Sequence, residues 1–317
     1  MLKLFSSSLV AATVALTLVA PASSADEPKV TIAMSGWTGF APLTLAAQAG
    51  LFKKRGVDVT IKKISQKDRL AALASGDVQA VATTVDTQLV WATTVPLTQV
   101  LVLDNSDGGD GIGARKAIAG IKDLKGKTVA VDGPGTTPYF FLAYILTKNG
   151  LNIKDIKTAT LEAQPAAQAF FAGQYDAAVT YEPYISQIRD MKDGSHIIAS
   201  SKEYPVIIDT LAFQPDYIAK NKTAVQAVVN GWFDALDMIK KDPKKSYEIM
   251  GADVKQTGEQ FAESAKYIKY IDKPENQKQM TSKMPDLLKT AAQIQLESKV
   301  IKKEPDLKKL VDAEFVK

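Results

Sequence analysis

Leu73-Ala-Ser-Gly-Asp-Val-Gln-Ala-Val-Ala-Thr83 decides the fold class, because an Ala/Leu-rich segment stops at Gly76 and a short strand-like segment follows. Phe170-Phe-Ala-Gly-Gln-Tyr-Asp-Ala-Ala-Val-Thr180 repeats this pattern, and its glycine lies 97 residues after Gly76. Each stretch predicts a helix, a glycine stop and a strand. Residues 53–56, which end in Gly56 before Val57, resemble residues 147–150, which end in Gly150 before Leu151. Two similar α/β lobes explain both pairs of similar segments; chance similarity of Ala/Gly-rich segments is the alternative.

The rest of the chain continues the alternation of short β-branched runs with longer periodic ones, which is typical of an α/β protein with mostly parallel strands. From Asp216 onward the chain is rich in Lys, Glu, Gln and Ala, so the C-terminal third is predicted to be mainly helical, with 267–271 as a short strand. The other predicted strands are residues 30–34, 57–64, 80–84, 98–103, 128–132, 157–161, 177–180, 196–200 and 207–214.

Composition excludes several classes of protein. The chain has 317 residues, of which 46% are hydrophobic and 23% charged, so it is neither disordered nor collagen-like. A formal net charge of +4 without a basic block does not indicate a nucleic-acid partner. With no cysteine and one histidine, disulfides, thiol nucleophiles and thiolate or multi-histidine metal sites are excluded. We therefore expect no metal and no cofactor.

The N-terminus has the pattern of a secretory signal peptide. A basic start, residues 1–3, precedes an apolar stretch, residues 4–20, and small residues lead to a predicted cleavage site after Ala25. The alternative is a membrane anchor, but the apolar stretch is short and no stop-transfer pattern follows. The sequence thus predicts a signal peptide over residues 1–25 and a mature protein released into a periplasm.

Several segments, in order along the chain, resemble substrate-binding proteins of ABC importers in the nitrate, sulfonate and taurine class. They are Ser35-Gly-Trp-Thr-Gly-Phe-Ala-Pro-Leu43, residues 46–59, residues 73–77, residues 121–131, Gly133-Pro-Gly-Thr-Thr-Pro-Tyr139 and residues 173–184. The resemblance implies a type II periplasmic binding protein: two Rossmann-like lobes, joined by two crossover segments, that close over a small ligand. It implies a first lobe of residues 26–111 and 209–317 and an inserted second lobe of residues 112–208. An inner-membrane ABC permease is the implied partner, and a monomer the implied state.

Ligands of open parallel sheets bind beyond the carboxyl ends of the strands, which selects the loop of residues 35–40 as one candidate. Gly36 and Gly39 allow close approach of backbone N–H groups, and Trp37 either lies against a ligand or packs between the lobes. We expect packing for Phe40. The binding candidates of this loop are Ser35, Gly36, Trp37 and Thr38.

Two further loops precede helices. In Thr83-Thr-Val-Asp-Thr87 we expect Thr84 to cap the helix and Asp86 to bind ligand. The turn of residues 133–139 offers free N–H groups to an oxygen-rich ligand group, and its candidates are Thr136, Thr137 and Tyr139. Capping by Thr136 or Thr137 is compatible with binding. The acid- and glycine-rich segment 104–111 lies where the first crossover is expected, and its spacing does not match a calcium loop.

The last candidates are Tyr181 and Glu182, after a predicted strand, and Asp209, on the strand that returns to the first lobe. Glu182 either binds ligand or only complements the helix dipole. Asp209 lies among apolar residues, where an unpaired carboxylate is costly, so a cation from the protein or the ligand is expected beside it. In the taurine-binding branch that the chain resembles, an acid on the equivalent strand faces the ligand amine.

These residues predict a non-catalytic solute-binding protein for a small polar ligand with an amine or amidinium group, such as a taurine-like aminosulfonate, a guanidine or a urea. Carboxylate pairing and cation–π contact would hold that group. No arginine occurs in the candidate segments, so a fully anionic ligand is less expected than a cationic one. Nitrate or a simple alkyl sulfonate is therefore the alternative ligand class. The alternative function is a secreted enzyme resembling pyrimidine-precursor synthases. A chain without cysteine and with one histidine, His196, departs from the cysteine-rich motif and active-site histidine of those enzymes.

Overall fold

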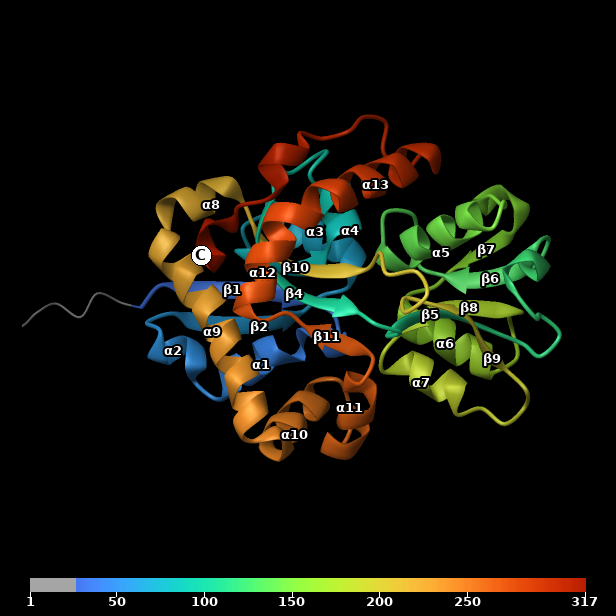
Figure 1. The fold of residues 1–317 in the computed structure, drawn as a ribbon, viewed down its shortest axis with the longest axis horizontal. Helices are drawn as coiled ribbons and strands as arrows, with labels where there is room; N and C mark the ends of the chain where they lie inside the picture. The colour runs from blue at the N-terminus through green and yellow to red at the C-terminus, as the bar shows by residue number, and fades with distance from the viewer. Residues whose placement is uncertain (1–26) are drawn as a thin grey trace, which may run out of the picture.

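The computed structural model describes residues 27–317 and contains two α/β lobes, each built on its own sheet (Figure 1). The predicted signal peptide lies outside the described residues. The sheet of the first lobe has six strands in the order β11-β4-β10-β3-β1-β2, and the sheet of the second lobe has five in the order β7-β6-β8-β5-β9. The predicted two-lobed α/β class is confirmed.

The first lobe places its helices mainly between consecutive strands of its sheet. Its strands are β1 (Lys29–Met34), β2 (Asp58–Lys63), β3 (Ala80–Thr84), β4 (Thr98–Ser106), β10 (Ile208–Phe213) and β11 (Ile268–Tyr270). Its first helices are α1 (Ala41–Gln48), α2 (Leu51–Lys54), α3 (Gln66–Ala74) and α4 (Val85–Trp91). The break between α1 and α2 falls at Gly50, which has a positive φ of 68° that glycine adopts without strain.

The second lobe is smaller and has the same local plan. Its strands are β5 (Asp110–Ala114), β6 (Thr128–Val131), β7 (Lys157–Thr160), β8 (Ala177–Tyr181) and β9 (His196–Ser200). Its α-helices are α5 (Thr137–Lys148), α6 (Ala163–Phe171) and α7 (Tyr184–Arg189).

The two echoing stretches of sequence occupy equivalent places in the two sheets. Strand β3 pairs in parallel with β1 and antiparallel with β10. Strand β8 pairs in parallel with β6 and antiparallel with β5. The sheet neighbours of β3 and β8 therefore correspond one to one, so that β10 of the first lobe is the counterpart of β5 in the second.

The segment 104–111, expected as a crossover loop, is mostly strand. Strand β4 continues to Ser106 and β5 begins at Asp110, so residues 107–109 alone join the two sheets there. The second connection, residues 201–207, joins β9 to β10. Both connections lead directly into strands that lie antiparallel to their neighbours β3 and β8.

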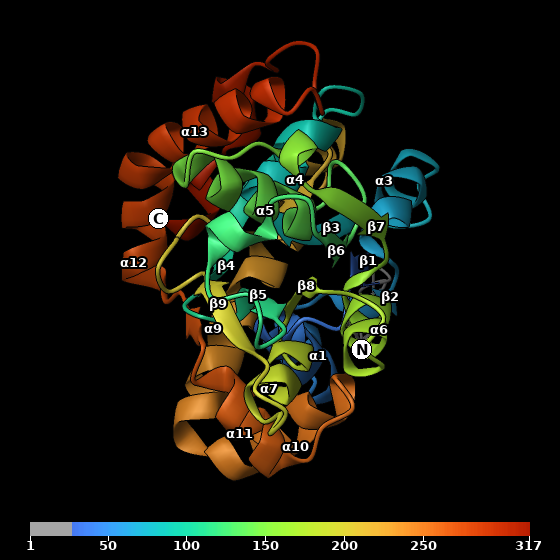
Figure 2. The same ribbon diagram turned by 90° about the vertical axis from the view of Figure 1, so that its right-hand side faces the viewer.

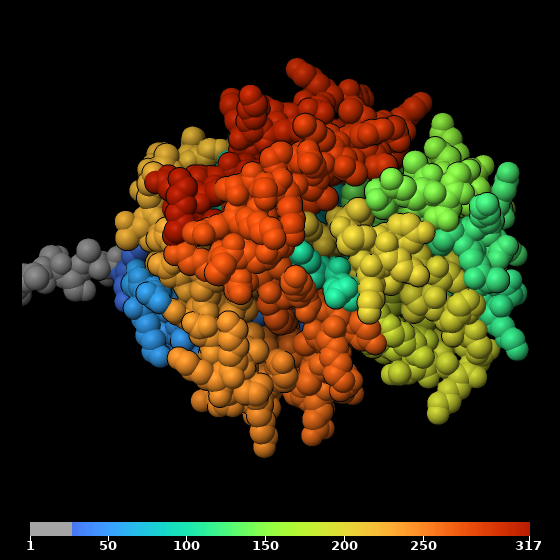
Figure 3. Space-filling view, in the orientation of Figure 1, coloured from blue at the N-terminus to red at the C-terminus, as the bar shows by residue number. Residues whose placement is uncertain are grey.

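The C-terminal third is helical, as predicted, apart from β11 and short turns of other helix types. Its α-helices are α8 (Pro215–Lys220), α9 (Lys222–Lys241), α10 (Pro243–Asp253), α11 (Gly258–Ala265), α12 (Lys273–Lys278) and α13 (Met284–Glu297). Helix α9 buries an apolar stripe at helical spacing, which includes Val225, Val228, Val229, Trp232 and Leu236. Helix α13, in the first lobe, contacts α5 of the second lobe. The C-terminal helices, drawn in orange to red, lie against the second lobe, drawn in green and yellow (Figures 2 and 3).

Candidate ligand-binding site

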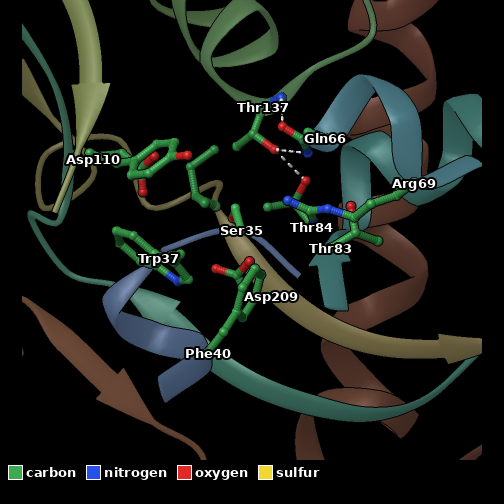
Figure 4. Close-up of a pocket in the computed structure, with 12 residues that line it drawn as sticks. Ser35, Trp37, Phe40, Gln66, Arg69, Thr83, Thr84, Asp110, Thr137 and Asp209 are labelled. Atoms are coloured by element: carbon green, nitrogen blue, oxygen red, sulfur yellow. Dashed lines mark hydrogen bonds between the residues drawn. The ribbon is translucent and has the colours of Figure 1, made fainter. Parts of the chain in front are cut away.

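A cavity of about 30 Å³ lies between the two lobes (Figure 4). Its walls come from the ends of strands in both sheets and from helices that follow them. The lining residues are Ser35, Trp37, Phe40, Gln66, Arg69, Thr83, Thr84, Asp110, Thr137, Tyr181, Ile207 and Asp209. A larger hollow of about 320 Å³ shares Ser35, Gln66 and Tyr181 with this cavity. The two spaces therefore adjoin at these residues, and we call the smaller one the inner cavity.

Asp209 stands in the middle of the first sheet. On β10 it lies directly opposite Thr84 of β3 on one side and Asp104 of β4 on the other. Its side chain is 2% exposed, and its Oδ2 has no hydrogen-bond partner in the described chain. Burial, with the neighbouring Asp104 carboxyl as the next cause, raises the pKa of Asp209 well above its ordinary value. The described residues supply no ion-pair partner to this buried acid.

Asp110 is the counterpart of Asp209 in the second lobe. It begins β5 and lies opposite Tyr181 of β8, as Asp209 lies opposite Thr84 of β3. Tyr181 and Thr84 are 97 residues apart, the spacing of the two sequence echoes. Asp110 is 4% exposed and its Oδ2 also has no partner among the described residues. Burial raises the pKa of Asp110 to about 7. Each lobe thus contributes one buried carboxyl group to the cavity.

Trp37 both lines the cavity and packs between the lobes. It precedes a 3₁₀ turn, Thr38–Phe40, at the end of the β1 loop. Its indole Nε1 donates a hydrogen bond of 3.3 Å to Asp104 Oδ1, and its ring meets Tyr181 edge to face at 5.6 Å between centroids. Phe40, expected only to pack, lines the cavity as well. The aromatic wall of the site therefore draws on both lobes.

Arg69, on α3, is the cation of the cavity wall, and no candidate segment contained it. Its side chain is buried; Nε donates to the carbonyl of Ile64 at 3.0 Å, and Nη1 donates to the carbonyl of Ala82. Burial lowers the pKa of Arg69 to about 10, while the nearby Tyr181 and Asp209 act in the opposite direction. A guanidinium with that pKa stays charged at neutral pH. The cavity thus has a cationic side as well as acids, contrary to the expectation of a site without arginine.

Thr137 is the contact point between the lobes. Its Oγ1 lies 2.6 Å from Thr84 Oγ1 and accepts a hydrogen bond of 2.9 Å from Gln66 Nε2 (Figure 4). The expected capping roles are not observed, because neither Thr84 nor Thr136 caps its helix through its side chain. Thr136 instead donates its hydroxyl to the carbonyl of Gly133 at 2.8 Å. The threonine hydroxyls at the starts of α4 and α5 hold the two lobes together.

Four other predicted site residues lie off the cavity wall. Thr38 is buried, and its carbonyl accepts a hydrogen bond of 3.1 Å from the Tyr270 hydroxyl. Gly36 borders the larger hollow. Thr136 is buried at the start of α5, and Tyr139 is half-buried on that helix. None of these four residues lines the inner cavity.

Asp86 and Glu182 are buried acids that do not line the cavity. Asp86 accepts a hydrogen bond of 3.2 Å from the Thr87 hydroxyl, and burial raises its pKa to about 7. Glu182 pairs with Arg189, which also stacks its guanidinium over Tyr267 of the first lobe at 3.8 Å and bonds the carbonyl of Gly108. Glu182 therefore has a cation from its own chain, whereas Asp86 has none among the described residues.

Of the residues predicted for the site, the structure gathers five around the inner cavity: Ser35, Trp37, Thr137, Tyr181 and Asp209. Sequence reasoning missed Gln66, Arg69 and Asp110. In residues 27–317, no group of three or more His, Cys, Asp or Glu side chains is arranged to hold a metal ion. Nor does any described helix have the length and apolar composition to cross a membrane.

The sequence model of the NMT1-like family matches residues 23–251. The chain belongs to the NMT1-like family. This NMT1-like protein is 27% identical over 222 residues to the taurine-binding periplasmic protein of Escherichia coli, a match covering 68% of this chain and 67% of that protein.

Two solved structures resemble the fold of the NMT1-like protein. The alkanesulfonate-binding protein SsuA from Xanthomonas axonopodis pv. citri, bound to MOPS, is 18% identical with a TM-score of 0.77, covering 92% of this chain and all of that one. The nitrate-binding protein NrtA from Synechocystis is 14% identical with a TM-score of 0.73, covering 90% of this chain and 86% of that one. These structures share the two-lobed periplasmic binding protein fold.

Proposed function

We propose that this protein is a non-catalytic periplasmic solute-binding protein that captures a small polar ligand between its lobes and delivers it to an ABC permease. Its family, its fold and the cavity between the two lobes support this function. The moving parts would be the two lobes, for which the sequence predicts residues 26–111 with 209–317 and residues 112–208; because β5 begins at Asp110 and β10 at Ile208, the boundaries would lie at residues 107–109 and 201–207. Hinge closure about the two connections would bury the ligand, and binding energy would shift the population toward the closed form.

The ligand we propose carries an amine or amidinium group. The observation that carries this proposal is Asp209, a buried carboxyl group on the cavity wall with one oxygen unpartnered among the described residues. A buried carboxylate without a cation is costly, and an ammonium or amidinium group supplies both charge and N–H donors. Asp110 provides a second acceptor from the other lobe, and Trp37 and Tyr181 provide ring faces for cation–π contact.

The far end of the same ligand would carry an oxygen-rich group. Arg69, Gln66 and Thr137 offer a guanidinium, an amide and a hydroxyl on the cavity wall. A taurine-like aminosulfonate fits both ends, and guanidine or urea types fit the acidic end. The inner cavity alone has room for about two water molecules, so a taurine-like ligand would also occupy the adjoining hollow of about 320 Å³.

Arg69 supports one alternative ligand class, nitrate or a simple alkyl sulfonate, because a buried guanidinium binds such anions without help from the acids. The two classes differ in what they require of Asp209. An amine-bearing ligand needs its charge, whereas a simple anion is repelled by it.

The proposed location is the periplasm, reached through the signal peptide of residues 1–25, and the proposed partner is an inner-membrane permease. We propose that the protein works as a monomer, since one chain supplies both lobes of the cavity. The name of its Escherichia coli relative, a periplasmic protein, supports the location.

Thermal unfolding of residues 26–317 with a panel of taurine, alkyl sulfonates, nitrate, guanidinium, urea and small amines tests the proposal, since a ligand that binds only the folded state raises its apparent stability. We expect taurine or guanidinium to stabilise the wild type, and Asp209→Asn to weaken their binding about 10- to 100-fold, as expected for a charge-assisted hydrogen bond. Stabilisation by nitrate or ethanesulfonate that Asp209→Asn leaves unchanged would overturn the amine assignment. Steady turnover of a bound compound would overturn the proposal that the protein is non-catalytic.

A further inference from the structure

Four carboxyl groups gather at the acidic side of the cavity, which is more than one ligand cation can pair with. Asp110 and Asp209 line the cavity, and Asp86 and Asp104 lie behind them. All four are at least nine-tenths buried, and each has one carboxyl oxygen without a partner in residues 27–317. None forms an ion pair with a lysine or arginine of that part of the chain, unlike Glu182 with its Arg189.

Asp104 and Asp209 are the tightest pair of the cluster. They lie directly opposite each other on β4 and β10, so their side chains extend from the same face of the sheet. Each has one buried carboxyl oxygen without a hydrogen-bond partner in residues 27–317. A carboxylate accepts hydrogen bonds and donates none, so two neighbouring carboxyl groups bond each other only when one of them carries a proton. Two ionised groups at this position repel each other strongly, because both side chains are almost completely buried. The buried cluster therefore needs bound protons or a cation.

The charged and titratable groups that face this cluster do not remove that need. Arg69 approaches from α3 but forms no ion pair with any of the four carboxyl groups in the described chain, and its Nε and Nη1 donate to backbone carbonyls. The Trp37 indole donates to Asp104, but it carries no charge. The remaining groups are the Tyr270 hydroxyl from β11, the Tyr181 hydroxyl from β8 and the Glu182–Arg189 pair at the start of α7.

We propose that the closed site exchanges protons for its ligand, so that it binds the positively charged form of an amine or amidinium and releases protons from the aspartate cluster as it does so. This inference rests on the proposed function for the identity of the ligand group. It adds that the charge itself is selected, which favours guanidinium over neutral urea and taurine over an uncharged analogue. Burial, which raises the pKa of Asp104 to about 8 and those of Asp86 and Asp110 to about 7, places the exchange near neutral pH.

Calorimetric titration of the wild-type protein with guanidinium and with taurine, at one pH in buffers of different ionisation enthalpy, measures the protons released. We expect the binding enthalpy to vary linearly with the buffer's ionisation enthalpy, and the affinity to rise about tenfold per pH unit for each released proton between pH 6 and 8. Asp104→Asn should reduce the number released, whereas Asp216→Asn, on the exposed start of α8, should not. Binding without proton release, or equal affinity for urea and guanidinium, would overturn the inference.

A second measurement needs no ligand and therefore separates failure of this inference from failure of the proposed function. In the window between the ordinary aspartate pKa and about 8, the folded cluster keeps protons that the unfolded chain has lost. The unfolding free energy of the empty protein should therefore fall as pH rises from about 5 to 8. Asp104→Asn should flatten this fall, and Asp216→Asn should not. If Asp104→Asn changes the unfolding free energy by the same amount at pH 5 and at pH 8, the inference is overturned, whatever the ligand is.

Discussion

The hydroxyl oxygens of Thr84 and Thr137 lie 2.6 Å apart, one at the start of α4 in the first lobe and the other at the start of α5 in the second. Gln66 reaches the same hydroxyl of Thr137 from α3 at 2.9 Å. These bonds join the lobes beside the cavity. In the proposed hinge motion they would break when the lobes part, so they would favour the closed form.

We expect Thr137→Val to favour the open form, because valine has nearly the same shape but cannot bond Thr84 or Gln66. Each hydrogen bond is worth about 0.5–1.5 kcal/mol, so the loss of both should lower taurine affinity by up to about 5- to 150-fold, with a larger radius of gyration by small-angle scattering. Thr223→Val, at an exposed position near the start of α9, is the matched control. An unchanged radius and affinity would mean that closure does not depend on this contact.

Gly39→Ala should disrupt the site by steric overlap. A methyl group at Gly39 would overlap the Asp104 carboxylate and the Trp37 indole nitrogen, although the backbone there does not require glycine. Overpacking of this kind costs about 1–3 kcal/mol, which urea unfolding would detect. Gly36→Ala is the control, because a methyl group at Gly36 has no neighbour within 4 Å. Equal stability of both variants would contradict the packing of Trp37 against Asp104.

Arg189→Met should destabilise the protein by about 3–5 kcal/mol, because it leaves the fully buried Glu182 carboxylate without its cation. The double variant with Glu182→Met should recover part of the loss, since both charges are then removed. Arg55→Met breaks the exposed pair with Asp234 and should cost no more than about 1 kcal/mol. Similar unfolding midpoints in urea for the two arginine variants would show that the Glu182 pair contributes no more than a surface pair.

Arg69→Met tests the oxygen-binding end of the proposed ligand. Taurine and ethylamine share an ethylammonium unit, and only taurine has a sulfonate to pair with Arg69. The ratio of their affinities should therefore fall about 10- to 100-fold in Arg69→Met, the range for a charge-assisted hydrogen bond. Arg115→Met removes an arginine that pairs with Asp193 away from the cavity and should leave the ratio unchanged. Equal losses for both ligands in Arg69→Met would assign this residue a purely structural role.

The sequence predicted the α/β class, ten of the eleven described strands and a buried acid at Asp209, because those features depend on local pattern, on apolar runs and on the cost of an acid among them. It did not predict β5. Asp110-Gly-Ile-Gly-Ala114 contains two glycines and lacks the β-branched run of a typical strand. These glycines are needed because α7 packs over β5, and a methyl group at Gly113 would come within 2.6 Å of the Ile188 side chain. The strand thus depends on a tertiary contact that no local pattern shows.

Arg69 was missed for a related reason. It occurs in an ordinary helical segment, Ser65-Gln-Lys-Asp-Arg69, with no glycine turn or strand end at its own position. Only the parallel order of β2, β1 and β3 brings α3 beside the cavity, where Arg69 bonds the carbonyls of Ile64 and Ala82. Predicting such a residue requires the strand order, which is a long-range property of the chain.

Asp110 and Asp209 occupy equivalent strands, yet they belong to different lobes and face one shared space. In the proposed open form, water would reach both acids, and they would ionise without a partner. Two negative charges would then face each other across the opening, so the ligand-free protein would close less readily than the protein with a bound cation. The ligand itself would supply the attraction that closes the lobes, and the proposed permease would meet few closed molecules without ligand.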